Sequence, residues 1–336
     1  MITVERVDSR ARFREFAAIT SDPPIMRSEM RGWYTGRHWF KGITLWLARD
    51  DQGRACGRMI THHSPALSAK LGLDAGLFGA FEARDADTAR ALLAHAQEVT
   101  DHAYLFGPVT PLPNVTGGVI RAGFDNPAFF DSAWNPEFIP RVLEEEGFKP
   151  WGIADTWEID VAGLPDDPPE PHEWEERGLR LVTARRFRAP DIREALNVSF
   201  AQLPYFTQIG RAQWKAQTSG LGLIMDPKLV LQAQDAEGVT QGFVLVVPDP
   251  IDWLRGKFWR RRRDAVLIIQ GTRPEMQGRG VLGLLTRQLY AALRAGAYRR
   301  LRVTFIGRDN PASARVFSKV GGRPLHELSF YLKDLR

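Results

Sequence analysis

The segment 266–285 constrains the fold of this chain more than any other. An apolar run leads through Gly271 into a turn that contains Gly278 and Gly280, and a helical pattern begins at Val281. The first backbone N–H groups of a helix have no partner within the helix and lie at the positive end of its dipole. A strand that enters a helix through such a turn predicts a phosphate site, because glycine lets an anion approach the backbone closely.

Further elements follow this turn. Apolar residues recur at the spacing of one helix face: Val281, Leu284, Leu285, Leu289 and Ala292. A second apolar strand is predicted at 301–306, and it leads into 310–321, where an Asn opens a helix and a Gly closes it. The end of the chain therefore predicts strand, turn, helix, strand and helix, in that order.

This order of motifs resembles the acyl-CoA signature of the GCN5-related N-acetyltransferase (GNAT) superfamily, in which a Gln-x-x-Gly turn joins a strand to a helix. The matching residues are Gln277 to Gly280, and 310–321 is similar to the second helix of that signature. One position departs, because Leu282 stands where the signature has a small residue. The resemblance implies an α/β fold, with a mixed and mostly antiparallel sheet flanked by helices, and acyl-CoA as the donor substrate.

The resemblance also implies roles for single positions. Backbone groups of Ile269, Gly271 and Thr272 are expected beside the pantetheine arm of the donor, and Asn310 near the same arm. The pyrophosphate is expected on the turn and on the first helical residue: Gln277, Gly278, Arg279, Gly280 and Val281.

Phe317 is expected beside the donor, where family members often have a Tyr that assists the leaving thiolate. Phenylalanine has no proton to give, although thiolate is a tolerable leaving group because a thiol has a pKa near 8.5. Our candidate acid is Tyr205, since the resemblance implies that Tyr205 and Phe206, after the predicted helix 191–200, border the acceptor. Packing of an aromatic loop anchor is the alternative role for Tyr205. The sequence predicts no general base.

Composition limits the other classes of protein. The 336 residues are 44% hydrophobic and 25% charged, and no window reaches the apolar length that spans a bilayer, so a cytoplasmic protein is expected. A single cysteine, Cys56, excludes an internal disulfide framework. The seven histidines show no zinc-binding spacing, so no metal is expected. Sequence motifs of serine hydrolases, nucleoside triphosphatases and dinucleotide-dependent dehydrogenases are absent.

Two similar halves are predicted. A proline-rich and acidic run suggests a linker at 164–173 between a domain at 1–163 and a domain at 174–336. The first half repeats the order of the second, with a strand at 76–82, a helix at 85–99, a strand at 104–107 and a helix at 135–147. This period predicts tandem copies of one fold.

The first copy is expected to be degenerate. Asp85 and Asp87 stand at the helix start where the second copy has its glycine turn. These carboxylates satisfy a helix N-terminus themselves and repel a phosphate. The first domain is therefore expected either to shape the acceptor site or only to stabilise its partner domain.

A segment rich in cations and aromatic rings points to an acceptor. Residues 255–263 hold six cations, and the candidate membrane contacts are Trp253, Phe258, Trp259, Arg260 and Arg261. Aromatic rings among cations suit a membrane interface with anionic lipid. They also suit single-stranded nucleic acid, or the segment is a solvated loop without a partner. A second such patch at 30–40 favours a lipid acceptor and peripheral contact with the inner membrane face, and makes nucleic acid the less favoured partner.

Motifs in the first half support a narrower resemblance. They are Phe78 to Glu82, Phe106 to Pro108, Gly123 to Asp125 and the helix 135–148. Together with the tandem arrangement they resemble a bacterial group of double acetyltransferase-fold proteins that includes the bacterial ceramide synthases. This implies transfer of a fatty acyl group from CoA to a sphingoid base. Asp125 is then a candidate contact for the acceptor headgroup, or a turn residue.

Two other functions stay open. One is an N-acetyltransferase that acts on a small-molecule or peptide amine. The other is a non-catalytic module that senses CoA or binds nucleic acid, because Leu282 and Phe317 both depart from the pattern of active enzymes.

Overall fold

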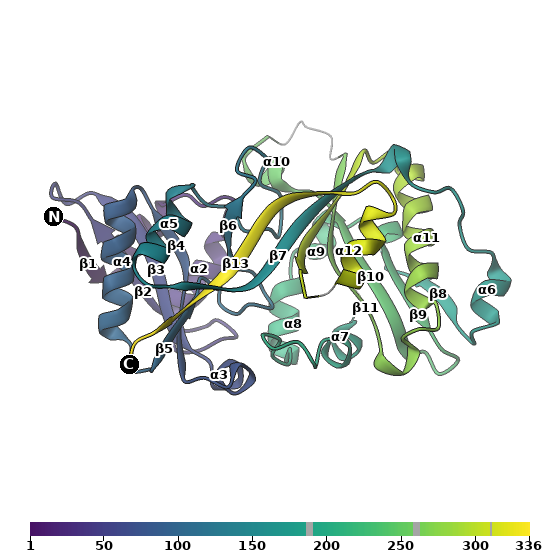
Figure 1. The fold of residues 1–336 in the computed structure, drawn as a ribbon, viewed down its shortest axis with the longest axis horizontal. Coiled ribbons are helices and arrows are strands. Elements are labelled where there is room, and N and C mark those ends of the chain that lie inside the picture. Colours follow the sequence, from purple (N-terminus) through teal and green to yellow (C-terminus); the bar gives the residue numbers. More distant parts are fainter. Residues whose placement is uncertain (186–190, 258–262, 310) are drawn as a thin grey trace. The chain divides into compact units, whose positions relative to one another are not determined.

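The computed structural model describes residues 1–185, 191–257, 263–309 and 311–336 (Figure 1). The chain divides into two compact units, and each unit is made of discontinuous segments. Unit 1 comprises Met1–Ala128, Ser132–Ala154 and His326–Arg336. Unit 2 comprises Phe129–Asp131 and Asp155–Leu325.

Unit 1 is built on a sheet in which β1 to β5 follow sequence order, with β13 beside β5 and β6 beside β13. β1 to β4 are antiparallel neighbours, whereas β4 and β5 are parallel because helix α4 connects them. The elements are β1 (Thr3–Arg6), α1 (Arg10–Ala18), α2 (Arg27–Thr35), β2 (Thr44–Arg49), β3 (Ala55–His63), α3 (Pro65–Leu71), β4 (Ala75–Ala83), α4 (Ala86–Val99), β5 (Tyr104–Gly107), β6 (Val119–Ala122), α5 (Phe138–Glu145), the start of β7 (Lys149–Asp160) and the end of β13 (Arg323–Asp334).

Unit 2 has the same plan. β8 to β11 are antiparallel neighbours, β11 and β12 are parallel and joined by α11, and β7 lies beyond β12. The elements are η1 (Val161–Gly163), α6 (Pro171–Glu175), β8 (Arg180–Thr183), α7 (Arg193–Ser199), α8 (Arg211–Thr218), α9 (Leu221–Ile224), η2 (Pro227–Leu229), β9 (Val230–Gln234), β10 (Thr240–Pro248), α10 (Ile251–Leu254), β11 (Asp264–Thr272), η3 (Pro274–Met276), α11 (Val281–Ala295), β12 (Arg300–Gly307) and α12 (Pro311–Ser318). The predicted repeat of one fold is therefore confirmed in the order and direction of the strands.

β10 shows how the sequence forms the core of unit 2. Its continuous apolar run is buried on both faces, as expected of a central strand. Val244 and Val246 pack into the cluster under α11, while Phe243 and Leu245 pack into the cluster under α7. Successive side chains of a strand point to opposite faces, so one run supplies both clusters.

The structure corrects the expected linker at 164–173. The chain passes from unit 1 to unit 2 at the 154/155 boundary, inside β7. Within 164–173, Leu164 is buried in the core of unit 2, and α6, which begins at Pro171, carries the buried Trp174 just after this range. Arg287 of α11 donates to the carbonyl of Asp167 at 2.8 Å. Proline and acid content predicted a linker here, but contacts with α11 hold the segment in place.

The C-terminal strand also departs from the expected boundary. Residues of β13 from His326 onward belong to unit 1, although the sequence placed them in the second domain. Tyr331 of β13 pairs with Gly107 of β5 in an antiparallel ladder. Composition cannot show this, because strand pairing is decided by partners far away in the sequence.

In unit 1 the chain itself fills the space where β4 and β5 part. Their parallel ladder ends at Leu77 and Phe106, and the chain after β5 then stays against β4. Val109 donates its amide proton to the carbonyl of Phe78 at 2.8 Å, and the hydroxyl of Thr110 accepts from Ala80 at 3.1 Å.

Gly79 tests this packing. A Cβ atom added to Gly79 would lie 1.6 Å from the carbonyl oxygen of Val109. We expect Gly79→Ala to lower the free energy of unfolding by about 3 kcal/mol, because it forces two backbone segments apart. The control is Gly163→Ala, where an added Cβ meets nothing within 4 Å. We expect that control to change stability by less than about 0.5 kcal/mol. The measurement is urea unfolding, and equal midpoints for the two variants would show that Val109 leaves β4 freely.

Candidate functional site

In unit 2 the parallel strands β11 and β12 separate before they end. Among the described residues, no other segment takes over the hydrogen bonds that this pairing leaves open. β11 and β12 pair only as far as Leu267 and Val303, although the strands continue to Thr272 and Gly307. Ile268 is an extra residue in β11, which forms a β-bulge opposite β10 at this point. Among the described residues, no hydrogen bond joins the part of β11 beyond Ile268 to β12.

Burial changes at the same point. Residues 265–267 and 301–303 are buried, whereas 268–271 and 304–305 are partly exposed. The hydroxyl of Thr304 donates toward the carbonyl oxygens of Leu267 and Ile268, each at 3.4 Å, and so spans the strands where they begin to part. The backbone of 269–272 beyond this point offers donors and acceptors to a ligand that lies along the strand.

The turn after β11 presents amide groups at its surface. Gly278 and Gly280 have φ angles of 74° and 76°, which glycine adopts without strain. No side chain caps α11, which begins at Val281. In the described part of the chain, the amides of Val281, Leu282 and Gly283 have no acceptor. Unpaired amides at the positive end of a 15-residue helix attract an anion such as a phosphate.

Arg177 lies at this turn, and sequence analysis missed it. Its Nε donates to the carbonyl of Arg279 at 3.1 Å, and its Nη1 donates to the carbonyl of Glu173 at 2.6 Å. A guanidinium nitrogen of Arg177 would lie 3.7 Å from a Cβ atom at Gly280. No motif marks Arg177, because it follows α6, far from the turn in the sequence. Together with the exposed Arg279 it adds positive charge beside the free amides.

Tyr205 lies beside β12, after the point where the strands part. Its ring meets the ring of Phe305 edge to face, with centroids 5.6 Å apart. Phe206, the next residue, is buried in the cluster under α7. The side-chain amide of Asn197 pairs with both backbone groups of Ile209, at 2.8 and 3.1 Å. These contacts fix the two ends of the loop, so Tyr205 is held against β12.

The electrostatic environment keeps Tyr205 protonated. Burial raises the pKa of Tyr205 to about 12, and the charge of Asp309 contributes in the same direction. Asp309 follows β12 and is exposed. Sequence analysis predicted no carboxylate here, and its position next to Tyr205 depends on the loop conformation.

The structure places the other predicted residues as follows. Ile269, Gly271 and Thr272 lie on the part of β11 that has left β12, and the hydroxyl of Thr272 is buried with no partner among the described residues. Phe317 is 3% exposed in the core beneath α11, so its ring offers almost no surface to a donor. Asn310 lies outside the described residues.

The predicted acceptor contacts Phe206 and Asp125 lie in different units. Phe206 is a core residue, 4% exposed, and has little surface for a substrate. Asp125 belongs to unit 1 and is exposed in a turn that the amide of Asn126 closes on the carbonyl of Gly123 at 2.9 Å. The structure thus agrees with the alternative of Asp125 as a turn residue.

The predicted membrane contacts are mostly not described. Trp253 lies on α10 and is partly buried. The other four residues lie outside the described residues: Phe258, Trp259, Arg260 and Arg261. Across the described ranges, no helix has both the length and the apolar content needed to cross a bilayer.

Three potential metal ligands meet in unit 1, where sequence analysis expected none. His63 ends β3, Asp74 precedes β4 and His102 precedes β5, so the strand registers bring them together. Nδ1 of His102 lies 2.7 Å from Asp74, and Nε2 of His63 lies 3.1 Å from the hydroxyl of Ser68. These mutual contacts account for the cluster, and the absence of a metal stays a prediction.

Unit 1 has no equivalent of this open strand edge and uncapped helix start. Asp85 caps α4 by accepting from the amide of Thr88 at 2.9 Å, which removes a free amide from that helix start. The amide of Val109 and the hydroxyl of Thr110 already occupy backbone groups of β4. The open strand edge and the uncapped helix therefore occur together in unit 2.

Comparison with known proteins places this fold. No protein family model matches the sequence, and no curated protein matches it. Among solved structures, a tandem GNAT protein from the clavulanic acid biosynthesis pathway is similar over 100% of this chain and 99% of its own, with a TM-score of 0.61 and 17% identity.

Two further solved structures have a similar fold. A GCN5-related N-acetyltransferase from Sphaerobacter thermophilus covers 100% of this chain and 96% of its own (TM-score 0.53, 16% identity). One from Anabaena variabilis covers 99% of this chain and 73% of its own (TM-score 0.54, 11% identity). At these identities the likeness shows the fold, so the predicted tandem GNAT fold is confirmed. The narrower resemblance to bacterial ceramide synthases gains no support from the comparisons.

Gly280 tests the turn as a binding site. We expect Gly280→Val to weaken CoA binding at least about tenfold, because a branched side chain strains a positive φ and displaces Arg177. The control is Gly53→Val, since Gly53 has a φ of 75° in a turn of unit 1 with nothing near its added Cβ. Calorimetry gives affinity and stoichiometry, and we expect one CoA per chain. Two sites per chain, or unchanged affinity in Gly280→Val, would contradict the assignment.

Proposed function

We propose that this protein is an acyl-CoA-dependent N-acyltransferase whose donor site lies in unit 2. One observation carries the proposal: the β11 edge that parts from β12 leads directly into a helix start with unpaired amides. A pantetheine arm has amides that pair with a strand edge, and a pyrophosphate needs the dipole and free N–H groups of a helix start. The two features are continuous in the chain, as the two parts of CoA are continuous in the ligand.

The residues of this chain fit such a donor. Gln277 to Gly280 form an exposed turn, and Arg177 and Arg279 supply positive charge beside it. Gly271 allows the strand to lie close to Phe243, because a Cβ atom there would come within 2.9 Å of that ring. The buried hydroxyl of Thr272 is available as a hydrogen-bond partner at the end of the open edge.

The proposed reaction is attack of an acceptor amine on the thioester carbonyl. A C–N bond forms, the C–S bond breaks, CoA leaves as a thiolate, and the amine nitrogen releases its proton to solvent. Tyr205 donates a hydrogen bond to sulfur as negative charge develops there. It does not transfer its proton fully, because its pKa of about 12 exceeds that of a thiol, near 8.5. Asp309 attracts the cationic form of the amine to the same place. That ammonium group releases one proton to solvent before attack, because only the neutral nitrogen has a lone pair, and the second proton leaves as the amide forms.

We propose a primary amine as the acceptor class. The finer proposal is a fatty acyl donor and a lipid amine such as a sphingoid base, at the surface of an anionic membrane. It rests on the aromatic and basic sequence at 253–263, of which Trp253 on α10 is the described aromatic residue. Acetyl transfer to a small-molecule or peptide amine uses the same donor site and differs only in the length of the acyl and acceptor pockets.

Tyr205→Phe tests the catalytic role. We expect kcat to fall about 10- to 100-fold with little change in the KM for acyl-CoA, because the hydroxyl acts on the developing thiolate. The matched control is Tyr290→Phe, which removes another buried hydroxyl of unit 2 whose pKa burial raises to about 12.

The pH profile gives an independent readout. A Tyr with a pKa of about 12 stays protonated well above neutral pH, so it adds no basic limb. We expect wild-type and Tyr205→Phe rates to have the same shape between about pH 6 and 10. If the basic limb of the profile disappears in the variant, Tyr205 titrates in that range and the proposed role is wrong.

A series of acyl-CoA donors separates the fatty acyl proposal from acetyl transfer. The measurement is calorimetric binding of acetyl-CoA to palmitoyl-CoA below the concentration of micelle formation. Affinity that rises with chain length, because each buried CH₂ contributes about 0.8 kcal/mol, supports a fatty acyl donor. Equal affinities would reject the fatty acyl proposal and leave acetyl transfer, without affecting the donor site itself.

A further inference from the structure

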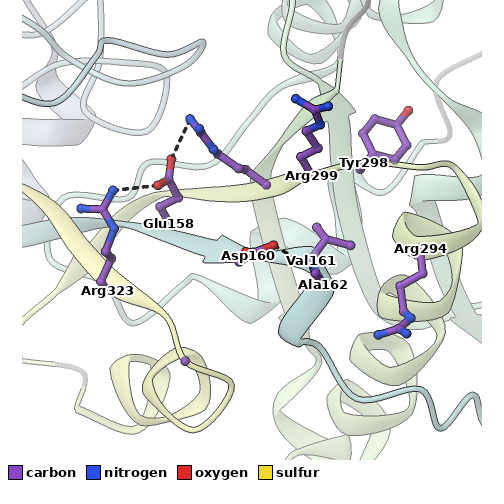
Figure 2. Close-up of a pocket in the computed structure, with 10 residues that line it drawn as sticks. Glu158, Asp160, Val161, Ala162, Arg294, Tyr298, Arg299 and Arg323 are labelled. Atoms are coloured by element: carbon purple, nitrogen blue, oxygen red, sulfur yellow. Dashed lines mark hydrogen bonds and ion pairs between the residues drawn. The ribbon is translucent and has the colours of Figure 1, made fainter.

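A second site lies at the other end of α11 in unit 2. A cavity of about 700 Å³ opens there. Figure 2 shows Glu158 joined to Arg323 on one side of it, and Arg294 on the other side of Val161 and Ala162. The remaining lining residues are Asp160, Tyr298, Arg299, Arg300 and Gly321.

The cavity is distinct from the donor site. Arg294 lies in the last turn of α11, and the unpaired amides belong to its first turn at Val281. At 1.5 Å per residue, thirteen residues separate these positions by about 20 Å. Arg300 begins β12, whereas the donor edge lies beyond the point where β12 leaves β11.

Arginines outnumber carboxylates in this cavity. Four arginines line it, against Glu158 and Asp160. Arg302 pairs with Glu158 at 3.2 Å; it is 4% exposed, and its guanidinium also contacts Asp249 and Asp264 at 3.3 and 3.2 Å. A buried arginine requires such partners. Because Arg302 shares one positive charge among three carboxylates, it offsets only part of the charge of Glu158.

Two exposed arginines, Arg323 and Arg300, also contact the carboxylate of Glu158. Arg323 lies 2.8 Å and Arg300 3.8 Å from its carboxylate, and both side chains are more than half exposed. Exposed ion pairs of this kind contribute little stability. Asp160 accepts a hydrogen bond from the amide of Ala162 at 3.0 Å, which orients it toward η1.

Arg299 is the most available cation of the cavity. Its backbone is fixed, because its amide donates to the carbonyl of Arg263 at 2.7 Å and its carbonyl accepts from Val161 at 2.9 Å. Its side chain is exposed and has no partner in the part of the chain that the structure describes. Arg294 is less available to a ligand in the cavity, since its guanidinium donates to the carbonyl of Leu164 at 2.7 Å.

The basic sequence before β11 ends at this cavity. Arg263 is exposed, and the hydrogen bond from Arg299 places its backbone beside the cavity. The last cation of that run therefore adds to the same positive surface.

We propose that this cavity binds a ligand that carries two or more phosphate groups. The guanidinium group is planar and presents paired N–H donors that match phosphate oxygens, and it holds its charge at all physiological pH values. Arg299, Arg300 and Arg323 project from a fixed backbone with an excess of positive charge. The ligand is either a free polyphosphate or phosphate headgroups of a lipid surface, which share this chemistry.

The test is titration of the full chain with tripolyphosphate by calorimetry at low salt. We expect Arg299→Ser/Arg323→Ser to weaken binding at least about tenfold, while CoA affinity stays the same. The control is Arg211→Ser/Lys215→Ser, which removes the same charge from the exposed α8 of the same unit. Arg299→Ser alone is a second variant, and it removes no described contact that stabilises the fold.

Vesicles of phosphatidylcholine with phosphatidic acid form the second arm of the experiment. Loss of tripolyphosphate binding in the double variant assigns a free ligand, and loss of vesicle binding alone assigns a lipid headgroup. The proposal is overturned if neither probe binds, or if the control weakens binding as much as the double variant. A third result also overturns the proposal: CoA displaces tripolyphosphate, and the double variant binds tripolyphosphate normally. The anion then occupies the turn at Gly280 and not this cavity. These readouts do not depend on acyltransferase activity.

Discussion

The parting of β11 from β12 after Leu267 and Val303 is the constraint on which the site in unit 2 depends. Parallel strands that stay paired have no free edge, and a strand that leaves its partner exposes backbone donors and acceptors to a ligand. The bulge at Ile268 and the hydroxyl of Thr304 mark this point. The same strand then enters α11 through glycines with positive φ, which adds the helix dipole at the end of the open edge.

Unit 1 shows what happens when the same topology is used for stability. Its strands β4 and β5 also part, but the segment around Val109 and Thr110 takes the vacant hydrogen bonds, and Asp85 caps the following helix. Two copies of one fold thus differ in a few backbone contacts. The proposed anion site needs those contacts to be absent, so the difference between the two copies has a local cause.

Much of the fold was predictable because it depends on local patterns. The apolar run before Gly271, the helical stripe of α11 and the glycine turn each predicted an element that the structure contains. The site was predictable only where a motif is contiguous. The sequence did not mark Arg177 or Asp309, because their neighbours are distant in sequence. Phe317, which the sequence predicts beside the donor, is buried beneath α11.

The sequence by itself determined the tandem plan, the strand that leads into a glycine turn, and the helix whose first amides are free. Each is set by residues within one segment, where periodicity and φ preferences act. Tertiary structure decided where the units divide, because β7 and β13 each contribute residues to both units. It also decided which arginines gather around Glu158 and which residue faces Tyr205. Those choices follow from strand register and loop packing, which depend on contacts between residues far apart in the chain.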